Sequence, residues 1–279
     1  MFTEILINIL VQLIYFVGFI FIVGFIISLL NRLFYFVVNH NRAVCYATGI
    51  IGTPIHELSH ALFCLIFFHK IEEMKLFQID EETGVLGYVN HTYNKKNIYH
   101  LIGNYFIGIA PIICGTAIIY FATKLLLPYT YSEVTAYVKD FALLQAEGAS
   151  WDTFVYVFAV IGGMLKAVFS EITSGYQWWI YIVIVFCIAL HMNLSGADIK
   201  GSLLGLPFVL LLIAIPNVIL GLVSSKAYGS FVGFMNTSGN YLMGTLLLSL
   251  IFSVIIVAIG GLVRGGISLV TLLKGIKKR

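Results

Sequence analysis

Long, uninterrupted apolar runs constrain this chain more than any other feature of its sequence. A helix needs about 20 mainly apolar residues to cross the hydrocarbon core of a bilayer, and residues 5–38 alone exceed that length. Hydrophobic residues make up 60% of the chain and charged residues 10%, against about 25% charged residues in soluble proteins. Because the runs are continuous rather than alternating, they exclude a transmembrane β-barrel. We therefore expect an all-α polytopic membrane protein.

The apolar runs predict about six or seven transmembrane helices in a single domain, residues 1–279. The run 153–170 is short and is interrupted by Gly162-Gly163 and Lys166, so it either crosses the bilayer or only dips into it. The first run lacks a basic start and a cleavage site, and we expect it to remain as an N-terminal anchor helix. We expect a multi-pass protein of a bacterial cell membrane. The expected spans are 5–38, 44–68, 101–127, 153–170, 177–194, 203–223 and 240–263.

The cysteines and the basic residues exclude several kinds of site and partner. The four cysteines stand singly in apolar runs with no C-x-x-C pair, so the sequence predicts neither a disulfide framework nor a thiolate zinc site. Much of the net charge of +3 comes from a short C-terminal tail. Such a tail is typical of a membrane-topology signal. We expect the lipid bilayer as a partner and no nucleic acid.

One motif in the second apolar run carries the chemistry. His56-Glu57-Leu58-Ser59-His60 places two imidazoles four residues apart, on one face of a helix. Such a pair can bind one zinc ion (Zn2+), and Glu57 can act as general base toward a water molecule on the metal. At this composition, the chance expectation for the pattern is about 0.006 per chain. The alternative is a pair of buried histidines that hydrogen-bond to neighbouring helices.

A hydrolytic zinc site needs a third protein ligand. Asp198 is the best candidate among four aspartates, because it lies in a glycine-flanked break between two apolar spans, where irregular backbone is tolerated. Ser195 stands three residues earlier, so Asp198 is alternatively part of a capping box at a helix start. His191 is the second candidate ligand. Asn193 would orient substrate or a ligand by hydrogen bonding, or it caps a helix end.

The polar interval 70–100 predicts a β-hairpin after the metal-binding helix. Residues 74–79 and 85–90 are typical of short strands, and residues 80–84 are typical of a turn. An edge strand at Leu86-Gly87-Tyr88-Val89 would hold an unfolded substrate segment by strand addition. Gly87 and Tyr88 are therefore candidate substrate-binding residues. The alternative is a simple solvated loop.

His56-Glu57-Leu58-Ser59-His60-Ala61 within an apolar span resembles the site-2 protease family of membrane-embedded zinc metallopeptidases. Gly108-Ile109-Ala110-Pro111 is similar to that family's glycine-proline helix, and Leu86 to Val89 is similar to its strand near the active site. The chain departs from the family at Asp198, which is not set in a Leu-Asp-Gly sequence.

The resemblance implies a zinc metalloendopeptidase that hydrolyses peptide bonds in or near membrane-spanning segments of another membrane protein. It implies His56, His60 and a later aspartate as metal ligands, and Glu57 as the base. The implied catalytic core comprises residues 44–127 and 177–223 of this chain.

Two other functions remain open at this point. A transporter would use the histidines and Asp198 to line a polar pathway across the membrane, with no need for stoichiometric zinc. A catalytically silent relative would bind membrane proteins equally well with Glu57 replaced.

Overall fold

The computed structural model describes residues 2–80, 82–146, 151–173 and 175–276, and it confirms the all-α polytopic fold with one small hairpin. Five helical segments of the described chain are long and apolar enough to cross a membrane, and two shorter apolar helices accompany them. The two shorter segments, Phe158–Ser170 and Tyr176–Leu190, correspond to the expected runs 153–170 and 177–194.

The helices follow the expected runs closely, except at the C-terminal end. The first span is continuous and contains a π-helical turn, η1, between α1 and α2. The last expected span, 240–263, is only part of a much longer helix, α9. The helices are α1 (Phe2–Leu13), η1 (Ile14–Gly18), α2 (Phe19–Val37), α3 (Arg42–Ile66), α4 (Ile98–Leu126), α5 (Pro128–Ala146), α6 (Trp151–Ser170), α7 (Tyr176–Leu190), α8 (Gly196–Val223) and α9 (Ser225–Ile276).

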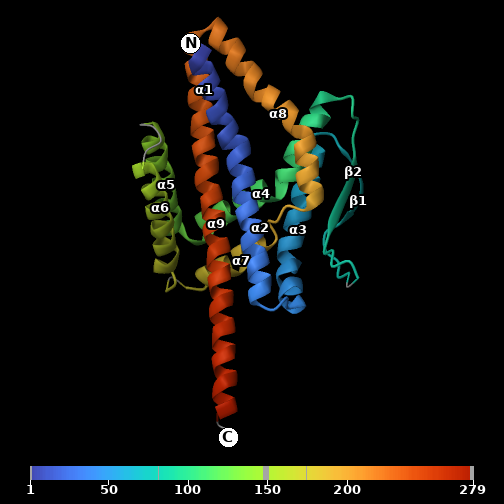
Figure 1. The fold of residues 1–279 in the computed structure, drawn as a ribbon, viewed down its shortest axis with the longest axis vertical. Helices are drawn as coiled ribbons and strands as arrows, with labels where there is room; N and C mark the ends of the chain where they lie inside the picture. The colour runs from blue at the N-terminus through green and yellow to red at the C-terminus, as the bar shows by residue number, and fades with distance from the viewer. Residues whose placement is uncertain (1, 81, 147–150, 174, 277–279) are drawn as a thin grey trace.

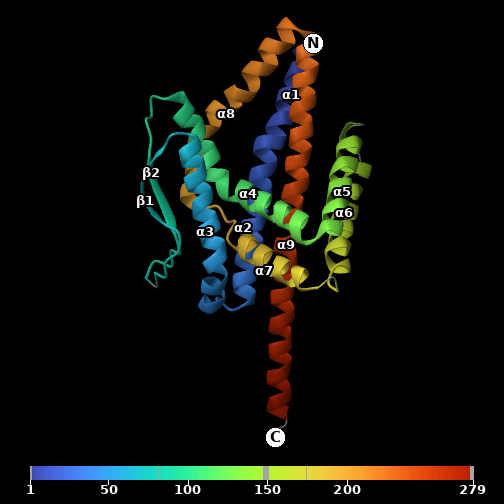
Figure 2. The same cartoon turned by 180° about the vertical axis from the view of Figure 1, so that it is seen from behind.

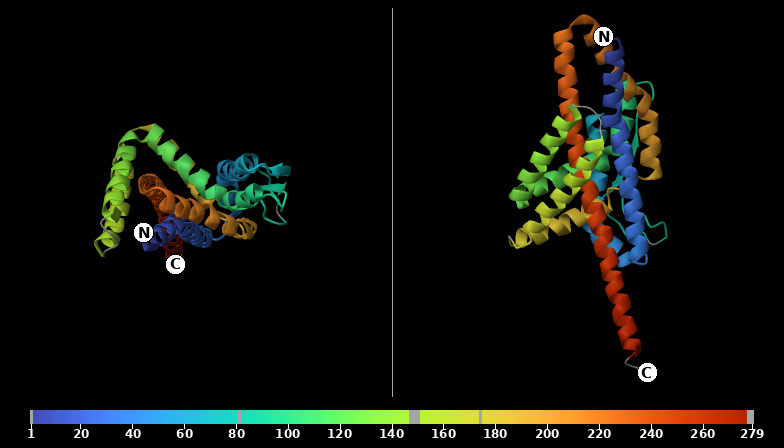
Figure 3. Two further views of the ribbon diagram at one scale, coloured as in Figure 1. Left: turned by 90° about the horizontal axis from the view of Figure 1, so that it is seen from above. Right: turned by 60° about the vertical axis from the view of Figure 1, so that its left-hand side comes forward.

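The long helices α1, α2 and α9 run side by side, and α9 extends well beyond them toward the C-terminus (Figure 1). Helix α4 crosses the bundle obliquely, from the hairpin at one side to α5 at the other (Figure 2). Seen from above, α5 and α6 lie on the opposite side of α9 from the hairpin (Figure 3). The His-Glu-x-x-His motif on α3 therefore lies on the hairpin side of the molecule.

Asparagine and serine side chains cap the N-termini of the helices around the site. Asn41 caps α3 by accepting from the backbone N–H of Ala43, 2.9 Å away. Asn97 caps α4 in the same way. Ser195 begins α8 as part of a complete capping box with Asp198. These caps satisfy backbone N–H groups that a helix start leaves unpaired.

Helix α4 forms the centre of the packing, between α3 on one side and α8 on the other. A Cβ atom at Gly108 would overlap Ser202 on α8, and one at Gly205 would overlap the backbone of Tyr105 on α4. The two helices can approach this closely only because these positions lack side chains. The crossing brings the start of α8 next to the motif helix.

The hairpin forms, but the predicted strand boundaries are wrong. The strands are β1 (Lys70–Lys75) and β2 (Tyr88–Thr92), antiparallel with Lys75 opposite Tyr88. The paired residues lie further from the turn than the predicted strands 74–79 and 85–90. Leu86 and Gly87, which were predicted to be in a strand, precede β2.

The long connection between the strands has its own turn, as predicted for residues 80–84. The Asp80 carboxylate accepts from the backbone N–H groups of Glu82 and Thr83. Gly84 has a φ of 71°, in the left-handed region that glycine adopts readily. Between this turn and the strands, the backbone N–H of Gln78 donates to the Leu86 carbonyl, 2.7 Å away. Residues 76–79 and 85–87, which were predicted to be in strands, therefore lie in this connection.

Candidate metal centre

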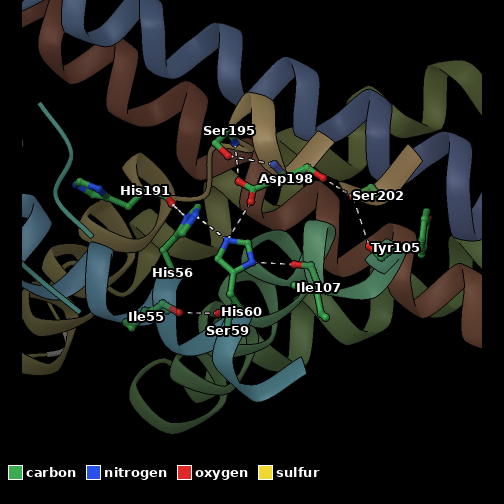
Figure 4. A network of polar contacts seen from close by, with 10 residues as sticks. All are labelled: Ile55, His56, Ser59, His60, Tyr105, Ile107, His191, Ser195, Asp198 and Ser202. Carbon is green, nitrogen blue, oxygen red and sulfur yellow. Dashed lines mark hydrogen bonds and ion pairs between the residues drawn. The ribbon is translucent and has the colours of Figure 1, made fainter. Parts of the chain in front are cut away.

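Helix α3 presents His56 and His60 on one face, and their Nε2 atoms lie 3.2 Å apart. Both side chains are fixed at their other ring nitrogen. His56 Nδ1 lies 2.6 Å from the backbone carbonyl oxygen of His191, and His60 Nδ1 lies 2.8 Å from that of Ile107 (Figure 4). A carbonyl oxygen can only accept, so each Nδ1 carries the proton and donates.

It follows that both Nε2 atoms of the neutral rings carry lone pairs, and these lone pairs face one another at 3.2 Å. Two acceptors at this distance repel each other unless a proton or a cation lies between them. Metal-bound histidines characteristically donate their other ring N–H to a backbone carbonyl or a carboxylate. The hydrogen bonds to His191 and Ile107 thus prepare both rings to bind a cation.

Asp198 completes this group from the start of α8. Its Oδ1 lies 3.4 Å from His60 Nε2, while its Oδ2 accepts from the backbone N–H of Ser195 at 2.7 Å. The carboxylate therefore belongs to the capping box and faces the imidazoles at the same time (Figure 4). The capping-box interpretation of Asp198 is thus confirmed. The same carboxylate lies beside His60, as the ligand interpretation requires.

Within the described residues, His56, His60 and Asp198 form the group of ligating side chains that could hold a metal ion, with one ligand atom from each within 4.8 Å of the others. Ligands of a tetrahedral zinc ion are about 3.3 Å apart. The separations of 3.2 and 3.4 Å are close to that value. Two imidazoles and one carboxylate also suit a catalytic zinc ion. The three residues could therefore hold a metal ion, and their donor set suits zinc.

Two cavities, each of about 350 Å³, lie beside this group. The first is bounded by His60 and Asp198 on one side and by β2 on the other. The second is bounded by the loop between α7 and α8. His56 and Glu57 line both cavities, and Glu57 is only 6% exposed. The predicted base thus lies beside the predicted ligands, in the wall that the cavities share.

The predicted substrate-binding residues Gly87 and Tyr88 both line the first cavity. A Cβ atom at Gly87 would lie 2.8 Å from the Glu57 side chain, so the hairpin touches α3 at the site itself. The Tyr88 hydroxyl donates to Glu73 of β1 at 2.6 Å. This hydrogen bond holds the Tyr88 ring against β1. The backbone of Tyr88 is the start of β2.

The third predicted substrate-binding residue, Asn193, lines the second cavity. Asn31 of α2 holds it in place, because the Asn31 amide donates to Asn193 Oδ1 at 2.6 Å and to the Ala189 carbonyl at 2.9 Å. Asn31 itself is fully buried. The loop between α7 and α8 is therefore anchored to the first span.

The structure does not bring the ring of His191 into the ligand group. Its Nε2 lies 3.1 Å from Thr48 Oγ1 and its Nδ1 lies 3.4 Å from Thr53 Oγ1, both on α3. Gly52 leaves room for this ring against α3. In Figure 4 the ring points away from His60, whereas the carbonyl oxygen points toward His56. His191 thus contributes to the site through its backbone.

Three residues near the site were missed in the sequence. Asn104 lies on α4, one turn before Gly108, and lines the first cavity together with His91 of β2. His69 Nε2 donates to the His100 carbonyl at 2.9 Å, so His69 Nδ1 accepts from Nδ1 of His91 at 3.0 Å. Two signals in the sequence could have pointed to these residues. Asn104 is a polar amide in an apolar run, and three histidines lie within the interval 69–100.

Burial lowers the pKa of His91 to about 4, and the neighbouring His69 and His60 rings act in the same direction. Burial also lowers the pKa of His69. Both rings are therefore neutral near pH 7. In its neutral form, His91 has its proton on Nδ1, so its Nε2 atom is an acceptor.

Comparison of the chain with protein-family models, with curated proteins and with solved structures found no match.

Proposed function

We propose that the protein is an intramembrane zinc metalloprotease that resembles the site-2 protease family. It would be a multi-pass protein of a bacterial cell membrane and would hydrolyse peptide bonds in or near membrane-spanning segments of other proteins. One observation supports this more than any other. Two imidazole lone pairs and the Asp198 carboxylate converge beside the Glu57 side chain, at the wall of a cavity large enough for a peptide segment.

His56, His60 and Asp198 would hold the zinc ion, and Glu57 would move the proton. When bound, zinc supplies Lewis acidity, which polarises a carbonyl group and makes water easier to deprotonate. Glu57 would accept a proton from the attacking water and transfer it to the leaving amine nitrogen. The backbone carbonyls of His191 and Ile107 keep both histidines in the tautomer that this arrangement requires.

The hairpin supports a peptide as the substrate. The sheet has two strands, so β2 pairs with β1 along one edge only, and its residues 88–91 line the cavity beside the ligands. An extended segment would add to that edge through backbone hydrogen bonds, which do not depend on its side chains. A substrate helix would have to unwind first, because helical peptide bonds already use their own N–H and C=O groups.

Purified protein in detergent micelles tests the proposal, with zinc measured by mass spectrometry and a panel of fluorescently labelled single-span membrane proteins as substrates. We expect one zinc ion per chain and cleavage of at least one substrate. Glu57→Gln should retain zinc and lose about 10²- to 10⁴-fold in rate, the usual contribution of a general base. Glu133→Gln, on α5 and away from the site, is the matched control and should cleave at the wild-type rate.

Three results would count against the proposal. Cleavage by Glu57→Gln at the wild-type rate would reject this residue as the base. Zinc-loaded wild-type protein that binds the panel without cutting any member would favour the silent relative. Solute transport by protein without zinc would favour the transporter.

A further inference from the structure

Asn104 of α4 is a buried amide with an unpaired donor. The residue is 4% exposed, and its Nδ2 atom has no hydrogen-bond partner among the described residues. Buried side-chain donors are nearly always paired, because leaving one unpaired costs free energy. An apolar residue would avoid that cost. The exception therefore calls for an explanation at this position.

The cavity beside the candidate metal centre provides that explanation, because Asn104 lines it together with His60 and Asp198. Asn104 lies one helical turn before Ile107, whose carbonyl oxygen fixes His60. The same rigid turn of α4 thus orients a candidate ligand and carries the unpaired amide. A group on a helix that packs closely against α8 is held in one position, as a preorganised donor must be.

The charge pattern of the cavity indicates what the amide would bind. The Asp198 carboxylate and Nε2 of both His56 and His60 present acceptors to this cavity. Hydrolysis of a peptide bond builds negative charge on the carbonyl oxygen, and that oxygen needs donors. Asn104 Nδ2 is an unpaired donor in the same wall.

We propose that Asn104 donates a hydrogen bond from Nδ2 to the carbonyl oxygen of the peptide bond under attack and binds that oxygen most strongly as it becomes negative. This inference rests on the proposed proteolytic function and adds a catalytic residue to it. The bond neither transfers a proton nor contributes a metal ligand.

The test compares the wild type with Asn104→Leu, which removes the donor at similar size, and with Asn104→Ala, which removes it at smaller size. We expect kcat for a cleaved single-span protein to fall about 10²- to 10³-fold, the usual effect of losing one such donor. KM and zinc content should stay close to the wild-type values. Asn240→Leu is the matched control, because Asn240 of α9 is also a buried asparagine with an unpaired atom. It should cleave at the wild-type rate.

A binding measurement separates this role from a structural one. A phosphinic analogue of the cleaved sequence carries a tetrahedral anionic group, and its affinity for zinc-loaded Asn104→Leu should fall about 10²-fold or more. The ordinary peptide, bound to the Glu57→Gln variant with and without Asn104→Leu, should change much less. If Asn104→Leu does not fold, the same phosphinic measurement on Asn104→Ala, which also lacks a side-chain donor, decides whether the donor is needed.

The outcomes distinguish the two proposals. Wild-type protein that holds no zinc or cleaves nothing contradicts the proteolytic function itself. Active wild-type protein whose Asn104 variants keep full kcat and full affinity for the phosphinic peptide overturns the role of Asn104 alone. Loss of zinc from the Asn104 variants would also overturn it, since the residue would then support the metal site.

Discussion

Asp198 Oδ1 lies 3.4 Å from Nε2 of His60, while the other oxygen of the same carboxylate caps helix α8 through the backbone N–H of Ser195. The start of α8 and the candidate metal centre are therefore fixed by one side chain. This arrangement places the third candidate ligand without a separate loop to support it. It also means that removal of Asp198 would affect both the helix and the site.

Two substitutions separate these roles. Asp198→Asn keeps an oxygen that can accept from Ser195 but loses the negative charge, so we expect zinc affinity to fall by more than about 100-fold, since outer-shell partners alone are worth about 10- to 100-fold. Ser195→Ala removes the cap and should cost about 1 kcal/mol of stability, with zinc affinity changed by less than about tenfold. Chelator competition measures the first quantity, and thermal unfolding of the metal-free protein measures the second. Equal zinc affinity in Asp198→Asn and wild type would exclude Asp198 as a ligand.

The crossing of α4 and α8 provides the next prediction. A Cβ atom at Gly108 would overlap Ser202 Oγ and the carbonyl oxygen of Asp198. Gly108→Ala should therefore push the helices apart at a cost of about 1–3 kcal/mol and move Asp198 away from His60. We expect a lower unfolding temperature together with weaker zinc binding.

Gly201→Ala is the control for this crossing, because its Cβ atom would meet nothing nearer than the Asn104 carbonyl oxygen at 4.0 Å. Gly201→Ala should leave the unfolding temperature and the zinc affinity unchanged, or stabilise α8 slightly through the higher helix propensity of alanine. If both variants lost zinc to the same extent, close helix approach would not be the cause.

Much of this fold follows from sequence pattern alone, because a membrane-spanning helix is a local structure whose backbone hydrogen bonds are internal. The run 44–68 predicted α3 (Arg42–Ile66) to within two residues at each end. The start of α9, before residue 240, was missed, since Ser225 to Asn240 is rich in glycine and polar residues. Its helix forms against α1 and α8, and such tertiary contacts leave no mark in a hydropathy profile.

The candidate site was predictable to the extent that it depends on spacing. The interval between His56 and His60 indicates one helix face, and the break before α8 singled out Asp198. The carbonyl groups that fix the two histidines belong to His191 and Ile107, and any residue type supplies a carbonyl. The sequence therefore has no signature for them. The metal, the substrate and the role of Glu57 stay predictions.

The contact between the hairpin and α3 can be tested at Gly87. A Cβ atom there would lie 2.8 Å from both Glu57 Cγ and Thr53 Cγ2, and 2.9 Å from the Lys75 carbonyl oxygen. Gly87→Ala should displace β2 from the site and lower the cleavage rate about 10- to 100-fold, as small misplacements of a substrate do. Zinc should remain bound, because the histidines are held from α4 and from the loop after α7.

Gly229→Ala on α9 is the matched control, since a Cβ atom there would have no neighbour within 4 Å. Comparison of cleavage rate and zinc content between the two alanine variants shows whether the contact between the hairpin and α3 positions the substrate. Loss of zinc from Gly87→Ala alone would mean that the hairpin supports the ligands rather than the substrate.

The paired histidines of the hairpin predict a dependence of stability on pH. Burial lowers the pKa of His91 to about 4 in the folded protein, whereas an exposed histidine in the unfolded chain has a pKa of about 6.5. Between these values the unfolded chain binds more protons than the folded one, so stability rises with pH. The contribution of His91 to the free energy of unfolding is therefore complete above about pH 6.5. It is lost progressively as the pH falls toward 4. Burial lowers the pKa of His69 as well, so its effect has the same sign.

His91→Gln isolates this contribution, because it leaves every other titrating group in place. We expect the unfolding temperature of wild-type protein to drop more between pH 7 and pH 5 than that of His91→Gln, with both measured in the same detergent. A cation bound beside His60 would lower the pKa of His91 further, since like charges disfavour protonation. Zinc-loaded protein should therefore show the dependence down to a lower pH than the metal-free protein. Identical pH profiles for the wild-type protein and His91→Gln would contradict a neutral, buried His91.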